Sequence, residues 1–364
     1  MKPILFNFTD AELEQYIVNL GQPKFRAKQI RDWLNRGAPD AASMKNIPET
    51  LRQDLDNQAQ TLPVKIVKKL KSADGETTKF LLELNDGEQI ESVLMRTTYG
   101  NSVCVSSQAG CAMGCKFCAS TLLGLKRNLS ANEIYAQILV AQWELRSEFF
   151  SEKHIKPNGD ANNNDVSHIV IMGTGEPLQN TENVIDFIER ANSQMGIGWR
   201  RITVSTCGIV PGIDRLIQWG RPINLAISLP TDELRSQIMP INNKYKLDEV
   251  LNAAWRFTDA HNRQLMIEYI LLGKHSENGE IVLYNAEPEH AEKLSELLNG
   301  KNCMVNLIPW NSVDERDFAS LSGNAIHRFQ DILIKNKIHS RIRRERGTDI
   351  GSACGQLRLN NAKK

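Results

Sequence analysis

From about residue 102 onward, short runs rich in Val and Ile alternate with longer stretches of helical periodicity. The runs are SVCVSS, VSHIVIMG, RRITVSTCG, INLAISLP, LMIEYILL and MVNLIPW, and between them lie stretches such as SANEIYAQILVAQWELR and LDEVLNAAWRF. Such alternation implies parallel strands with covering helices. About six repeats, rather than eight, predict an open partial (βα)6 barrel, in which sites gather at the carboxyl ends of the strands.

The first hundred residues follow a different pattern. AELEQYIVNL, KFRAKQIRDWLNR and PETLRQDLDNQ carry apolar residues at three- and four-residue steps, which predicts helices. KIVKKL, TKFLLEL and EQIESVLM follow, and we expect them to be the strands of a small sheet. The predicted fold class is therefore α/β, with a small amino-terminal α+β accessory domain over residues 1–100, the partial barrel over 101–346, and a carboxyl-terminal loop and tail over 347–364.

Charge and cysteine content restrict the class of protein. Net charge is only +1, so affinity for nucleic acid must come from local patches such as residues 335–364, where nine Lys or Arg stand against two acids. A solvated surface explains such a run equally well. No apolar run approaches the ~20 residues that cross a bilayer, and the amino terminus lacks a signal-peptide core, so we expect a cytoplasmic protein without membrane contact. Seven cysteines, an odd number, favour metal or redox chemistry over a disulfide framework.

Three cysteines stand together after the first predicted barrel strand. The segment SSQAGCAMGCKFCAS holds Cys111, Cys115 and Cys118 at the spacing C-x3-C-x2-C. A zinc site usually needs two such hooks, so here it would need Cys104 or a distant histidine as the fourth ligand. A trio of buried structural thiols is the plainest alternative. A four-iron cluster held by three thiolates instead leaves one iron open to a small molecule.

The spacing, with Phe117 before the last cysteine, resembles the signature of the radical S-adenosylmethionine superfamily. The resemblance implies a [4Fe-4S] cluster that cleaves S-adenosylmethionine to methionine and a 5′-deoxyadenosyl radical. GTGEP at 173–177 follows a predicted strand; its glycines let the backbone approach a ligand, and Glu176 can accept from an ammonium. Three more polar residues fall at or just beyond strand ends, where they can hold ribose or carboxylate groups: Ser205, Ser228 and Asn311.

Two further cysteines point to a narrower family. Cys104 lies on the strand that leads into the cluster loop, and Cys354 lies in DIGSACGQL, after a run of arginines that favours its thiolate. With IESVLM, VCVSSQAGCAMGCKFC, MGTGEPLQN and GTDIGSACGQL, the chain resembles the RlmN/Cfr family of RNA methyltransferases over about residues 20–357. Members of that family methylate an adenine carbon of ribosomal RNA.

The resemblance implies a role for each matching residue. Cys354 takes a methyl group from one S-adenosylmethionine as an S-methylcysteine intermediate, and a second molecule supplies the radical, so that two are used per turnover. The methylene radical adds to adenine, Glu91 is the proton acceptor, and Cys104 attacks the Cys354 sulfur, which releases the RNA and forms a transient disulfide. Met172 matches a methionine near the methylated cysteine. The implied S-adenosylmethionine contacts are Gly175, Glu176, Ser205, Ser228, Leu229 and Asn311.

Several positions depart from the family pattern. Thr174 stands where the family has methionine, and Pro230 stands where it has histidine, which removes a backbone donor. The segment GKHSENGEIVLYNAEPEHAE, residues 273–292, is longer than usual. These loops border the site, so they bear on the RNA target rather than on the chemistry.

The expected function is therefore methylation of an adenine ring carbon by a radical S-adenosylmethionine enzyme. We expect C2 as the carbon, 23S ribosomal RNA as the substrate with transfer RNA as a second one, and flavodoxin or ferredoxin as electron donor; C8 stays open. One alternative is a radical S-adenosylmethionine enzyme with a substrate other than RNA. Another is a non-catalytic RNA-binding module with a structural zinc or iron–sulfur site, which leaves Glu91 and the paired cysteines without a role.

Overall fold

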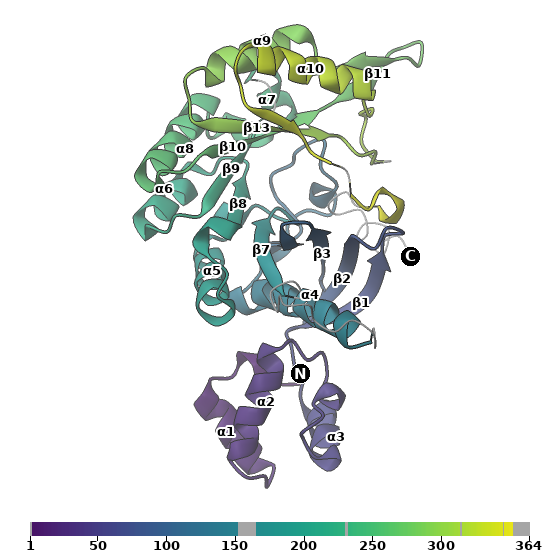
Figure 1. The fold of residues 1–364 in the computed structure, drawn as a ribbon, viewed down its shortest axis with the longest axis vertical. Helices are drawn as coiled ribbons and strands as arrows, with labels where there is room; N and C mark the ends of the chain where they lie inside the picture. The colour runs from purple at the N-terminus through teal and green to yellow at the C-terminus, as the bar shows by residue number, and fades with distance from the viewer. Residues whose placement is uncertain (1, 152–164, 230–231, 314, 345, 352–364) are drawn as a thin grey trace.

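The computed structural model describes residues 2–151, 165–229, 232–313, 315–344 and 346–351. Its centre is one open ten-stranded sheet in the order β1-β2-β3-β4-β7-β8-β9-β10-β13-β14 (Figure 1). The strands are β1 (Val64–Lys71), β2 (Thr77–Leu84), β3 (Gln89–Thr97), β4 (Gly100–Cys104), β7 (Val166–Ile171), β8 (Ile202–Thr206), β9 (Asn224–Ser228), β10 (Leu265–Leu271), β13 (Cys303–Pro309) and β14 (Ser340–Ile342). Two small antiparallel pairs lie outside this sheet: β5 (Gln108–Ala109) with β6 (Arg127–Asn128), and β11 (Gly273–His275) with β12 (Ile281–Leu283).

The helices after residue 130 pack along the outside of the curved sheet, and those before residue 60 form a group at one end of the molecule (Figure 1). The α-helices are α1 (Asp10–Asn19), α2 (Phe25–Asn35), α3 (Glu49–Gln58), α4 (Ala131–Ser151), α5 (Thr181–Met195), α6 (Val210–Trp219), α7 (Asp232–Ile238), α8 (Leu247–His261), α9 (Pro288–Leu298) and α10 (Gly323–Lys335). Short 3-10 turns are η1 (Leu5–Asn7), η2 (Ala41–Ser43), η3 (Ala119–Thr121), η5 (Pro177–Gln179), η6 (Trp199–Arg201), η7 (Pro240–Asn243) and η8 (Thr348–Ile350). Within the described residues, every helix is too short or too polar to span a bilayer.

The predicted partial barrel is confirmed. Strands β4, β7, β8, β9, β10 and β13 are neighbours and run parallel, and the chain forms at least one helix between each pair. Strand β14 pairs in parallel with β13 and adds a short seventh strand to these six. The first crossover helix begins where the sequence indicates, because Ser130 and the side chain of Glu133 form a reciprocal capping box at the start of α4.

The first three strands do not form the small separate sheet that the sequence suggested. Strand β3 pairs antiparallel with β4 through a tight hairpin, and Val93 lies opposite Cys104 in that pairing. Strands β1 and β2 then continue the same sheet. The boundary expected at residue 100 therefore lies inside a continuous sheet, because a hairpin of two or three residues brings neighbouring strands directly into register.

Residues alternate between the two faces of the barrel sheet. On β7, Ile169 and Ile171 face the helices and are almost fully buried, whereas His168 and Val170 face inward and are half-buried. Directly paired residues share a face, so the register carries this division across the sheet, from Cys104 to Val170 to Thr203. On β7 the inner face is therefore the more exposed one, and this face is where polar side chains of a site can stand.

The amino-terminal helices pack against the first barrel helix. Phe6 stacks on Tyr135 of α4 with ring centroids 5.8 Å apart, and Trp33 of α2 lies 6.3 Å from Trp143. Gly37, which follows α2, has a φ of 84°, and a side chain there would overlap the backbone carbonyl of a residue in α4. This contact fixes the helical group at one end of the sheet.

We therefore expect Gly37→Ala to lower the free energy of unfolding. A left-handed backbone costs an alanine about 1–2 kcal/mol, and the overlap with Leu139 adds about 1–3 kcal/mol. Gly21→Ala is the matched control, because Gly21 has a similar φ of 73° with nothing within 4 Å of the new carbon. Denaturant titration of both variants measures the difference; equal losses would mean that the helical group does not depend on this contact.

Candidate functional site

The three cysteines lie on the loop that leaves the first barrel strand. This loop runs from β5 to η3, at the carboxyl end of β4, where the sequence predicts the site. Gly110 opens the loop with a φ of 85°, and any side chain there would overlap the carbonyl of Gly124. Cys111 and Cys115 are buried and Cys118 is half-buried. Only glycine permits this close return of the chain, so the loop is held shut at its base.

Contacts from distant parts of the chain fix the loop from outside. The indole nitrogen of Trp310, just after β13, donates to the carbonyl of Phe117 at 3.0 Å, and a guanidinium nitrogen of Arg316 donates to the carbonyl of Cys118 at 2.6 Å. The backbone N–H of Lys116 donates to the carbonyl at the end of α7 at 2.9 Å. The loop is therefore preorganised by contacts from the end of α7 and from the segment that follows β13.

The thiols stand in an environment that resists ionisation. Burial raises the pKa of the Cys111 thiol to about 12, and the neighbouring Cys118 and Glu176 add to the shift. Burial likewise raises the pKa of Cys115, with further contributions from Cys118 and Cys111. Three thiols that oppose each other's ionisation become stable thiolates only around a strongly cationic centre. The donor set therefore fits a metal cluster.

Three thiolates fall one short of the four protein ligands of a closed zinc site. Among the described residues, no three or more His, Cys, Asp or Glu side chains are grouped to hold one metal ion. Ligands of one zinc ion must converge on a point, whereas thiolates on different irons of a cluster stand further apart. Cys207 and Cys303 are core residues.

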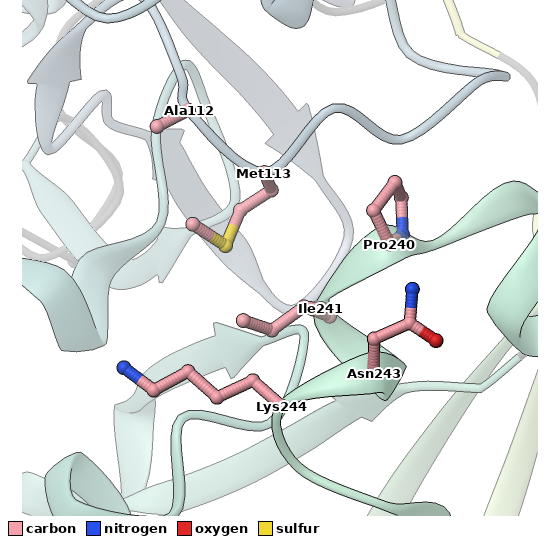
Figure 2. A pocket seen from close by; sticks show the side chains of 6 residues that line it. All are labelled: Ala112, Met113, Pro240, Ile241, Asn243 and Lys244. Atoms are coloured by element: carbon pink, nitrogen blue, oxygen red, sulfur yellow. The ribbon is translucent and has the colours of Figure 1, made fainter.

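A pocket of about 420 Å³ opens beside the cysteine loop (Figure 2). Ala112 and Met113, which lie between the first two cysteines, form one wall. The opposite wall is η7 and the residue after it, with Pro240, Ile241 and Lys244. The pocket lies next to the cysteine loop, and its volume is in the range of small-molecule sites.

The GTGEP segment is joined to the base of the cysteine loop by backbone and side-chain hydrogen bonds. The N–H of Thr174 donates to the Ser106 hydroxyl at 2.9 Å, and the N–H of Glu176 donates to the Gln108 side chain at 2.8 Å. Gly175 has a φ of 108°, and a side chain there would come within 2.5 Å of Gln108. Gly175 therefore permits the close contact with the cysteine loop, in addition to any approach of a ligand.

Glu176 is buried and holds an internal network. Its carboxylate accepts from the Thr206 hydroxyl at 2.7 Å and from the backbone N–H groups of Cys207 and Leu178 at 2.8 and 2.9 Å. Burial raises the pKa of Glu176, and these hydrogen bonds oppose the shift. The Cys207 thiol also hydrogen-bonds to this carboxylate, so Glu176 ties the end of β8 to the GTGEP segment.

The remaining predicted S-adenosylmethionine contacts lie at the carboxyl ends of the barrel strands. Ser205 and Ser228 are half-buried and share the inner face, because Ser205 pairs with Ala226, two residues before Ser228 on β9. Asn311 follows β13 and is also half-buried. Leu229 is buried and its N–H bonds to the carbonyl of Glu268, so only its own carbonyl is left to meet a ligand.

Glu91 and Cys104 share the inner face of the sheet. Both are buried, and Glu91 lies two residues from Val93, the residue opposite Cys104. The ammonium of Lys79 lies 2.8 Å from the Glu91 carboxylate. Met172 is half-buried at the end of β7, beside this group of strands. The structure therefore brings the expected base and the expected resolving thiol to one side of the sheet.

Cys354 and Pro230 lie outside the described residues, and so does the expected pairing of Cys354 with Cys104. The chain that leads to Cys354 is described as far as Gly351. Asp349 accepts from the N–H of Ala73 at 2.8 Å, and the carbonyl of Gly351 accepts from Lys79 at 2.8 Å. This segment therefore returns to the first hairpin of the sheet, close to Glu91.

Comparison with known proteins agrees with this geometry. The model described as "Ribosomal RNA large subunit methyltransferase N-terminal domain" matches residues 4–61, and the "Radical SAM superfamily" model matches residues 105–283. The probable dual-specificity RNA methyltransferase RlmN of Clostridium acetobutylicum is 44% identical over 98% of this chain and 97% of its own length. This chain belongs to the RlmN family.

Other RlmN relatives and a solved structure extend the match. The probable dual-specificity RNA methyltransferase RlmN of Geobacillus kaustophilus is 44% identical over 100% of this chain and 94% of its own length. A radical SAM methyltransferase from Sphaerobacter thermophilus is 38% identical, covers 97% of this chain and 98% of its own, and superimposes with a TM-score of 0.79. The family resemblance inferred from sequence is therefore confirmed over the whole chain.

The sequence did not reveal two charged residues on the inner face of this RlmN fold. Lys79 is one. The other is Glu268 of β10, which lies opposite Ser228 and is 5% exposed; burial raises its pKa, and one carboxyl oxygen has no hydrogen-bond partner among the described residues. A charged residue inside an otherwise apolar strand, as in TTKFLLEL and LMIEYILL, is the signal that marks both positions.

We expect Cys118→Ala to prevent cluster assembly, because it removes one of the three thiolate ligands of the irons. Anaerobic reconstitution with iron and sulfide should give about four irons per chain in the unchanged protein and well under half of that in the variant. Cys303→Ala removes a buried core thiol of β13 and is the control that should load fully. Equal iron in the Cys118 and Cys303 variants would contradict the assignment.

Proposed function

We propose that this enzyme methylates an adenine ring carbon, C2, in 23S ribosomal RNA and in transfer RNA through an S-methylcysteine at Cys354. The observation that carries the proposal is that Glu91 and Cys104 share one face of the sheet, next to the anchored segment that leads to Cys354. The relatives are named dual-specificity RNA methyltransferases, which supports RNA as the substrate.

The cysteine loop would hold the cluster through Cys111, Cys115 and Cys118. When bound there, a [4Fe-4S] cluster supplies the electron that cleaves S-adenosylmethionine to methionine and a 5′-deoxyadenosyl radical. Two molecules of S-adenosylmethionine per turnover follow from the two roles, as methyl donor and as radical source. Glu176 would accept from the ammonium of the substrate, and the rim residues would meet its ribose and carboxylate groups: Ser205, Ser228, Leu229 and Asn311.

The chain's own residues then carry out the transfer. The Cys354 thiolate attacks the sulfonium methyl and becomes S-methylcysteine, with S-adenosylhomocysteine as the leaving group. The 5′-deoxyadenosyl radical then takes a hydrogen atom from this methyl group. The methylene radical adds to adenine. Glu91 takes the proton from the substituted carbon, and the adduct passes one electron to a one-electron acceptor such as the oxidised flavodoxin or ferredoxin. The Cys104 thiolate then attacks the Cys354 sulfur, which forms a disulfide and releases the methylated RNA as its carbon takes up a proton.

Several surfaces suit the partners that this reaction needs. The amino-terminal helices and the exposed arginines near the carboxyl end, such as Arg341 and Arg343, would contact RNA phosphates, a contribution that weakens with salt. Arg346 is less available, because it pairs with Glu76 at 2.6 Å. An electron-donor protein such as flavodoxin or ferredoxin would dock on the surface around the pocket beside Met113. We place the enzyme in the cytoplasm with its RNA substrates.

We expect methyl-deuterated S-adenosylmethionine to yield methyladenosine with two deuteriums rather than three, because transfer passes through a methylene. The experiment uses anaerobically reconstituted enzyme and RNA from a strain that lacks this gene, digested to nucleosides for mass spectrometry. Chromatography against standards separates the C2 and C8 products. No labelled nucleoside, despite cleavage of S-adenosylmethionine, would mean that the substrate is not RNA.

We expect Cys104→Ala to leave the enzyme covalently joined to RNA, because the thiol that releases the adduct is lost. A denaturing gel with labelled RNA detects the adduct, and methyladenosine should fall at least about a hundredfold. Cys303→Ala serves again as the core-thiol control. Normal turnover of the Cys104 variant, with no retained RNA, would refute the resolving role.

A further inference from the structure

Lys79 occupies a position that an ammonium group rarely takes. It is 0% exposed, in the middle of β2, whose neighbouring residues Phe80 and Leu82 belong to the hydrophobic core. A lysine is almost never fully buried unless its charge is paired and hydrogen-bonded, since desolvation of an isolated ammonium is very costly. The chain therefore retains this charge at a cost, which points to a purpose beyond packing.

The ammonium joins two parts of the site that are far apart in sequence. Its nitrogen lies 2.8 Å from a carboxylate oxygen of Glu91 and 2.8 Å from the carbonyl oxygen of Gly351. The first contact spans two adjacent strands, and the second spans 272 residues of chain. One cation thus holds the expected proton acceptor and the end of the chain that carries the expected methyl acceptor.

Strand register places this junction beside the resolving thiol. Lys79 lies opposite Val93 on β3, and Val93 lies opposite Cys104 on β4. Residues paired in this way point to the same face, and strands are about 4.8 Å apart, so Lys79 and Cys104 start about 10 Å from each other on one face. Glu91 is on the same face, two residues along β3 from Val93.

Two further contacts hold the carboxyl-terminal segment near Lys79, and neither of them involves Glu91 or Cys104. Arg346 pairs with Glu76 at 2.6 Å, and Asp349 bonds to Ala73, both at the turn that precedes β2. Gly351 is the last described residue, and Cys354 is three positions further along the chain. Three residues of extended chain cover about 10 Å at most, so Lys79 anchors the segment within reach of Glu91 and Cys104.

We propose that Lys79 is a positioning residue, which ties the methyl-carrying end of the chain to the base of the reaction. Its ammonium orients the Glu91 carboxylate through a charge-assisted hydrogen bond. The same group holds the Gly351 carbonyl, which tethers the chain three positions before Cys354. The proposal rests on the proposed function, since it assigns Lys79 a part in that same reaction.

The test compares Lys79→Met, Lys79→Arg and Glu91→Gln in reconstituted full-length enzyme. Lys79→Met keeps the side-chain length and removes the charge, so we expect methyladenosine to fall about a hundredfold, as for loss of a general base. The RNA–protein adduct should accumulate, as in Glu91→Gln, because the proton is no longer removed. Lys79→Arg keeps a cation with several donors and should recover activity to within about tenfold of the unchanged enzyme.

Two readouts separate positioning from folding. Hydrogen exchange of residues 347–351 should rise in Lys79→Met, while S-adenosylmethionine cleavage and the melting temperature of Lys79→Arg stay near those of the unchanged enzyme. Lys301→Met, an exposed lysine before β13, is the control for loss of a positive charge and should change neither adduct nor turnover. If Lys79→Met does not fold, Lys79→Arg is the test: activity within about tenfold of the unchanged enzyme, without accumulated adduct, supports the positioning role.

Three outcomes would overturn the proposal: normal turnover in Lys79→Met, an Arg variant as defective as the Met variant, or loss of activity without adduct or change in exchange. Failure of the proposed function gives a different pattern, since the unchanged enzyme would then yield no methyladenosine and no adduct with any RNA. The exchange measurement needs no substrate, so it tests the Lys79–Gly351 contact in either case.

Discussion

The antiparallel pairing of β3 with β4 is the constraint on which the rest of the site depends. It converts a parallel barrel sheet, open at its first strand, into a longer sheet that starts with a three-stranded antiparallel segment. Without that pairing, Glu91 would belong to a separate unit and its distance from Cys104 would vary with the movement of a linker. With it, backbone hydrogen bonds fix the two residues on one face, and the first strands also provide a surface on which the end of the chain returns.

The cysteine loop is rigid for a related reason. Its base is joined to the end of β7 through Ser106 and Gln108, and its outer turn is held by Trp310 and Arg316 from beyond β13. The buried thiols raise one another's pKa, so holding them close together is unfavourable in free energy. Folding of this scaffold overcomes that cost before a metal centre binds. The Glu176 network extends the same scaffold to β8 through Thr206.

Much of this could be predicted from the sequence, because it depends on local patterns. The Val- and Ile-rich runs, the Ser130–Glu133 cap and the C-x3-C-x2-C spacing each report on neighbours within a few residues, and the structure has the barrel strands and the cap where they indicate. The placement of β1–β3 in the barrel sheet was not predictable in the same way, since strand pairing depends on register between segments and not on either segment alone. Lys79 was missed because its two partners lie 12 and 272 residues away.

The return of the carboxyl-terminal segment to the first hairpin has a consequence for biosynthesis. A ribosome makes β2 early and Gly351 almost last, so the hairpin and the cysteine loop can fold while the segment that carries Cys354 has not yet been made. The contact between the two ends can form only when translation is nearly complete. A chain that stalls or is cut before this segment would keep the cysteine loop but lack Cys354, so the end of the chain joins a framework that has already folded.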